Sequence, residues 1–111
     1  MERRRLAHYQ ILYWHDIPLQ VRSGDRRNRV SQELPPRFQA AVDSAAMAAN
    51  LVGTDDYLNQ FSWSDPEERE GDPEEVVAAV VAELDQRFPQ VPWQQTAARL
   101  AVRNSGSGDA G

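Results

Sequence analysis

The sequence contains no cysteine and no lysine, and it has no long apolar run. Without cysteine there are no disulfides, thiolate metal sites, cysteine nucleophiles or cysteine-held iron–sulfur clusters. No apolar segment approaches the roughly 20 residues that a membrane-spanning helix needs. The basic N-terminus, with Arg3, Arg4 and Arg5, is not followed by the apolar region of a secretory signal. We therefore expect a cytoplasmic protein without membrane contact.

Charge is distributed unevenly along the 111 residues, although the net charge is only −5. Residues 1–37 carry eight arginines against four acidic residues, a net charge of +4. Residues 55–85 carry eleven acidic residues against Arg69 alone, a net charge of −10. The two regions are expected to attract each other within the molecule, or each to meet a partner.

Three short strands are predicted in the first third of the chain. Residues 7–14 alternate with period two, which predicts a strand whose inner face holds Ala7, Tyr9, Ile11 and Tyr13. Pro18 cannot donate to a strand ladder, so the pairing is expected to break there. Residues 19–23 and 29–34 form a hairpin around the turn at 24–28.

Helices are predicted in the rest of the chain, around a polar linker at residues 64–72. The first spans 37–50, with an apolar stripe of Phe38, Val42, Ala45, Ala49 and Val52. The second, after Thr54 as N-cap, runs from 55 to about 63, with Tyr57, Leu58 and Phe61 facing inward. The third runs from 73 to about 88, capped by Asp72, with an apolar stripe of Val77, Val80, Val81, Leu84 and Phe88. Residues 93–102 form a weak fourth helix.

These elements predict an α+β fold, in which a small three-stranded antiparallel sheet has two to three helices packed on one face. A basic arm at residues 1–6 precedes the domain at 7–88. Residues 89–111 are expected to be weakly helical and then disordered, because the final residues are small and polar.

No constellation of catalytic or metal-binding residues emerges from the sequence. His8 and His15 lie seven positions apart, on opposite faces of the expected strand, so they are not expected to share a metal. No nucleophile elbow is present, and the acidic residues fall in a solvated linker and a helix start. We predict a protein that is not an enzyme and that has no cofactor and no metal site.

The stretch YWHDIPLQV supplies the main candidate surface. Tyr13 and Ile17 are expected in the core, and Asp16 is expected to cap or pair locally, with an arginine of the hairpin. Alternation then places Trp14 on the sheet face opposite the helices, as an exposed anchor for a protein partner. The predicted partner surface comprises Leu12, Trp14, His15, Asp16 and Gln20. Alternatively, the fourth helix folds back over this face.

The arginines of the hairpin support a different class of function. Nucleic acid or another anionic ligand would contact Arg22, Arg26, Arg27 and Arg29. The acidic second half of the chain makes nucleic acid an unlikely partner.

The sequence resembles a small bacterial domain family named virulence factor. The resemblance rests on YWHDIPLQV, on RFQAAVDSAAM within the first helix and on GTDDYL after it, and it covers about residues 11 to 88. His15 departs from the family pattern, which usually has lysine or arginine at that place. The resemblance implies a domain that stands alone or is joined to larger proteins, including ones with iron–sulfur-scaffold-like and helical-repeat regions. It carries no assigned catalytic residue.

Together the residues and the resemblance predict a non-catalytic accessory or protein–protein interaction module with an unidentified protein partner. Anion binding through the arginine hairpin is the alternative. A third possibility is a small subunit that completes the active site of a partner enzyme.

Overall fold

Two antiparallel strands, β1 (Leu6–Trp14) and β2 (Ile17–Ser23), form the centre of the sheet. The computed structural model describes residues 6–24, 27 and 29–109. β3 (Val30–Glu33) pairs antiparallel with β2, so these strands occupy the three predicted segments.

The β1–β2 register breaks where the sequence predicted it. Ile11 pairs with Val21 and Leu12 with Gln20, but Tyr13 then pairs with Pro18. Proline has no N–H to offer the ladder, which explains why the irregularity falls beside it.

Strands β4 (Phe61–Trp63) and β5 (Glu67–Glu70) both pair antiparallel with β1, on the edge away from β2. The described residues therefore form a five-stranded sheet rather than the predicted three-stranded one. The predicted linker at 64–72 was wrong for its central part, and the predicted second helix ends earlier than expected. A charged strand of four residues carries no apolar alternation that would reveal it.

Side chains tie β5 to its neighbours. The Tyr9 hydroxyl donates a 2.7 Å hydrogen bond to Glu67 Oε2. Arg69 donates to both carboxylate oxygens of Glu83 on α3 (Pro73–Arg87), at 2.9 Å to Oε1. These contacts compensate for the missing apolar residues of the strand.

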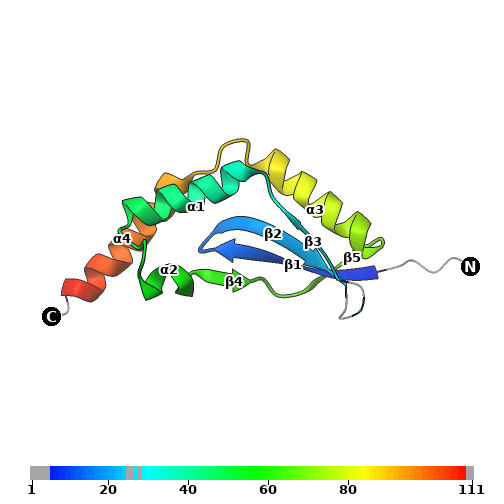
Figure 1. Cartoon of the computed structure of the whole chain (residues 1–111), viewed down its shortest axis with the longest axis horizontal. Helices are drawn as coiled ribbons and strands as arrows, with labels where there is room; N and C mark the ends of the chain where they lie inside the picture. Colours follow the sequence, from blue (N-terminus) through cyan, green and yellow to red (C-terminus); the bar gives the residue numbers. More distant parts are fainter. Residues whose placement is uncertain (1–5, 25–26, 28, 110–111) are drawn as a thin grey trace, which may run out of the picture.

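Helices α1 (Pro36–Ala48) and α3 cover one side of the sheet (Figure 1). Their buried residues form the core together with the inner faces of β1 and β2. At the end of α3, Phe88 packs edge-to-face on Phe38 of α1, with ring centroids 6.3 Å apart. The start of α3 matches the prediction, because Asp72 and Glu75 form a capping box and Pro73 occupies the first turn.

The connection between α1 and the sheet departs from the prediction in two places. Val52 is 62% exposed and Leu58 is 64% exposed, so neither faces inward as expected. α2 (Asp55–Asn59) is one short turn, capped as predicted by the Thr54 hydroxyl, which accepts from the Tyr57 N–H. It is too short to present a stripe of apolar residues to the core.

The last helix, α4 (Trp93–Asp109), packs against α1 on the helical side of the sheet. It continues past Val102, where we expected it to end. Thr96, Ala97 and Leu100 are buried beside α1. α4 therefore does not fold back over the far side of the sheet (Figure 1). Within the described residues, no helix is long and apolar enough to cross a membrane.

Candidate functional site

Among the described residues, α1, α3 and α4 lie on one side of the sheet. The opposite side is here called the open face. Direct cross-strand partners project to the same side of a sheet. Leu12 pairs with Gln20 on β2 and with Trp63 on β4, and Gln10 pairs with Arg22. The open face accordingly comprises His8, Gln10, Leu12, Gln20, Arg22 and Trp63. Ile11 and Val21, the adjacent pair in the ladder, are buried on the helical side.

Arg22 is the most constrained side chain of the open face. Its guanidinium carbon lies 3.8 Å from the centre of the Trp63 ring, a cation–π contact. Its Nε and Nη2 donate to Gln10 Oε1 at 3.1 and 2.9 Å. Gln10 is itself held, because its Nε2 donates at 3.0 Å to the Ser64 carbonyl oxygen. The guanidinium is therefore fixed before any ligand arrives.

A pocket of about 270 Å³ opens beside this arginine. Its walls combine strand residues, the turn after β2 and the start of β3: His8, Gln10, Arg22, Ser23, Gly24, Arg29 and Pro66. Across the described residues, no carboxylate forms an ion pair with Arg22 or Arg29. Glu68 approaches the pocket from the side of His8, with its Oε2 3.6 Å from His8 Nε2. Two arginines therefore line the pocket without a carboxylate partner in the part of the chain that the structure describes.

The predicted partner surface is only partly assembled. Leu12 and Gln20 lie side by side on the open face, both partly exposed. Trp14 does not belong to that surface: its side chain is 0% exposed, and the prediction of an exposed anchor was wrong. β4 places Phe61 beside it as its cross-strand partner, and the Tyr57 ring lies 5.7 Å from the indole.

His15 and Asp16 form the turn between β1 and β2 and serve the fold. His15 has a left-handed backbone with φ of 58°, and its Nδ1 lies 3.1 Å from Gln60 Oε1. Asp16 accepts hydrogen bonds from Thr96 Oγ1, at 2.5 Å, and from Arg99 Nη1. Its arginine partner therefore comes from α4, and the prediction of a hairpin arginine was wrong.

The arginines of the hairpin separate into different positions. Arg22 and Arg29 line the same pocket, whereas Arg27 is exposed in the turn. Arg26 lies outside the described residues.

Sequence reasoning missed Trp63, the aromatic residue of the open face. The alternation of Phe61 and Trp63 around Ser62 was a weak strand signal, which we assigned to the end of a helix.

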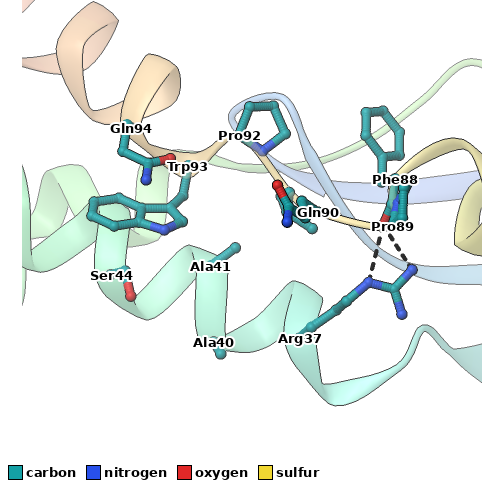
Figure 2. A pocket seen from close by; sticks show the side chains of 11 residues that line it. Arg37, Ala40, Ala41, Ser44, Phe88, Pro89, Gln90, Pro92, Trp93 and Gln94 are labelled. Carbon is teal, nitrogen blue, oxygen red and sulfur yellow. Dashed lines mark hydrogen bonds between the residues drawn. The ribbon is translucent and has the colours of Figure 1, made fainter.

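A larger groove of about 680 Å³ lies between α1 and the segment joining α3 to α4 (Figure 2). Arg37 points its guanidinium to the end of α3, where Nε and Nη2 donate to the Phe88 carbonyl oxygen at 3.0 and 2.7 Å. Nη2 also donates to Asp85 Oδ1 at 2.5 Å. Trp93 lies at the other end of the groove, beside Ser44. The charged group of this groove is thus engaged in holding α1 to α3.

Metal-binding residues do not converge in the part of the chain that the structure describes. No group of three or more histidine, aspartate or glutamate side chains there is placed to hold a metal ion.

Fold and surface together define a small α+β domain whose sheet has one helix-covered side and one open side. The chain belongs to the virulence factor family, whose sequence model matches residues 12–95. The predicted resemblance is therefore confirmed. No curated protein and no solved structure matches the chain. The matched region contains Arg22, Arg29 and Trp63 but begins after His8 and Gln10.

Proposed function

We propose that this domain is a non-catalytic interaction module that docks a protein partner on the open face. The observation that carries the proposal is the row formed by Gln20, Leu12 and Trp63 across three adjacent strands. Leu12 and Trp63 remain partly exposed, although α1 and α3 cover the other side of the central strands β1 and β2.

The chemistry of this row suits a protein interface. Tryptophan and arginine are the residue types most enriched at energetic hot spots, and aliphatic neighbours exclude water around them. Here Trp63 and Leu12 supply apolar area, while Arg22 and Gln20 supply polar groups beside them. The surrounding β-strands are rigid, so little ordering is needed when a partner binds.

Co-purification from the native host through a C-terminal tag tests the proposal. We expect one protein to be enriched with the wild type and lost with Trp63→Ala. Trp93→Ala is the matched control, because Trp93 is also a partly exposed tryptophan but lies in the groove of Figure 2. Equal urea midpoints for the variants establish matched folding.

The outcomes distinguish docking on the open face, docking in the groove and an accessory role in an enzyme complex. Loss with Trp63→Ala alone supports docking on the open face. Loss with Trp93→Ala alone moves the interface to the groove, and recovery that ignores both variants contradicts the proposal. If the captured partner gains an enzymatic activity only when this domain is added, the domain is an accessory subunit of an enzyme complex.

Nucleic-acid contact is the second candidate, since Arg22 and Arg29 line one pocket. The neighbouring β5 carries Glu67, Glu68 and Glu70, which would repel an extended chain of phosphates. A steep fall of affinity with salt would identify this alternative, whereas apolar docking changes little with salt.

A further inference from the structure

The pocket between Arg22 and Arg29 has the properties of a preformed anion site. Partly buried charges are normally paired, because removing them from water is costly. Arg22 is partly buried, yet its described partners are the neutral Gln10 and the ring of Trp63. Within the described residues no carboxylate pairs with Arg22, so its guanidinium can accept an anionic partner.

The described hydrogen bonds of Arg22 use only part of its guanidinium. Its Nε and Nη2 contact Gln10 Oε1, and no described residue accepts a hydrogen bond from Nη1. Arginine presents planar N–H donors that match the oxygens of phosphate or carboxylate groups. Because Trp63 and Gln10 already fix the side chain, binding costs little further conformational entropy.

Size and surrounding charge limit the ligand. A cavity of about 270 Å³ is slightly smaller than the usual small-molecule pocket of roughly 300–1,000 Å³, which suits one phosphate group and a small substituent. Glu68 stands at the His8 side of the pocket, 3.6 Å from that ring. A compact anion held between two arginines avoids this carboxylate, but a polyanion running along the sheet would meet it.

We propose that this pocket binds a single phosphate-type oxyanion. Arg22 and Arg29 contact its oxygens, and Gln10 acts as a positioning residue that holds the Arg22 guanidinium. The anion is either free inorganic phosphate or the phosphate of a small phosphomonoester. Arg22 also borders the proposed docking row, where it lies over the Trp63 ring. Anion binding needs no second protein, however, so a titration of the isolated chain tests it separately from docking.

Nuclear magnetic resonance on the isolated protein tests the site. The reporters are the indole N–H of Trp63 and the Nε–H of Arg22, followed during titration with sodium phosphate and, at matched ionic strength, with sodium chloride. We expect a saturable shift of both signals with phosphate and only a small linear drift with chloride.

Three variants and one control variant test which residues bind the anion. Arg22→Gln is expected to abolish the saturable shift, and Arg29→Gln to weaken binding about tenfold or more, as the loss of one charge-assisted contact implies. Arg22→Lys preserves the charge without the planar fork, and is expected to bind weakly while remaining folded. Arg87→Gln removes an exposed arginine far along α3 and is expected to leave binding unchanged.

Two further titrations distinguish the sources of the anion. Tighter binding of phenyl phosphate than of inorganic phosphate indicates a phosphomonoester, and the reverse order indicates the free ion. The proposal is overturned if phosphate acts no differently from chloride, or if Arg87→Gln weakens binding as much as Arg22→Gln. It is also overturned if a single-stranded oligonucleotide binds more tightly in proportion to its length.

Discussion

The indole Nε1 of Trp14 donates a 2.9 Å hydrogen bond to the backbone carbonyl oxygen of Tyr57, 43 residues further along the chain. This bond connects the end of β1 to α2, the helix that directly precedes β4. It therefore helps to hold β4 in place along the edge of β1. Trp14 therefore stabilises the fold, whereas Trp63 is partly exposed.

Trp14→Phe is expected to lower the free energy of unfolding by about 1–3 kcal/mol, because the Tyr57 carbonyl loses its indole donor. Trp63→Phe is the control and is expected to change stability by less than about 1 kcal/mol, since its side chain is partly exposed. Urea unfolding followed by far-ultraviolet circular dichroism measures both. Equal losses in the two variants would contradict the distinction between a core and a surface tryptophan.

Arg37→Met is expected to lower the free energy of unfolding by about 1.5–3 kcal/mol, which is the usual contribution of hydrogen bonds that involve a charged group. The substitution removes the contacts with Asp85 and with the Phe88 carbonyl that hold α1 to the end of α3. Arg87 is an exposed arginine at the end of α3 and serves as the control. Arg87→Met is expected to leave the free energy of unfolding within about 0.5 kcal/mol of the wild-type value. The same chemical denaturation experiment compares the two variants. An equal effect of both substitutions would contradict a specific role of Arg37 in holding α1 to α3.

Asp16→Ala is expected to loosen α4 without unfolding the domain. The substitution removes the acceptor of Thr96 and Arg99, which connects the β1–β2 turn to α4. A local loss of about 1 kcal/mol speeds amide exchange roughly fivefold. Hydrogen exchange should therefore rise in α4 and stay unchanged in α3. Asp16→Asn retains an oxygen for Thr96 and should have a smaller effect, because an exposed ion pair contributes only about 0.2–1 kcal/mol. Uniform acceleration in both helices would instead indicate global destabilisation.

Tyr9 is expected to titrate at unusually high pH. Its hydrogen bond to Glu67, together with burial and the nearby carboxylate charge, raises the pKa of the hydroxyl from 10.0 to about 12. The neutral phenol is the form that the folded state stabilises, so this stability is fully present below pH 10 and is lost as pH rises toward about 12. Ultraviolet titration of tyrosinate in the wild type and in Tyr9→Phe should show that the variant lacks the highest step. Loss of a step at the ordinary pKa would refute the assignment.

Local patterns predicted the elements that are stabilised locally. The sequence Asp72-Pro73-Glu74-Glu75 predicted the start of α3, because capping depends on residues within one turn. Pro18 predicted the break in the β1–β2 ladder, because the missing N–H is a property of that residue alone. Alternation correctly placed Tyr9 and Tyr13 against the core and Leu12 with Gln20 on the other side.

Elements that depend on distant partners were not predictable from local pattern. Glu67–Glu70 forms a strand because β1 supplies the ladder and because Tyr9 and Glu83 bind its side chains, and nothing within those four residues indicates this. The burial of Trp14 follows from the same cause. The predicted surface therefore included the buried Trp14 and omitted Trp63, which lies beside Leu12.

The short outer strands bear on the colloidal behaviour of the protein. Both long strands, β1 and β2, have neighbours on either edge, so the outer edges of the described sheet belong to β3, β4 and β5, of 4, 3 and 4 residues. A second molecule finds only a few backbone groups to pair with at such edges, and on β5 its glutamates would face like charges. Short edge strands of this kind disfavour edge-to-edge pairing between molecules, which is the route by which sheets extend into fibres.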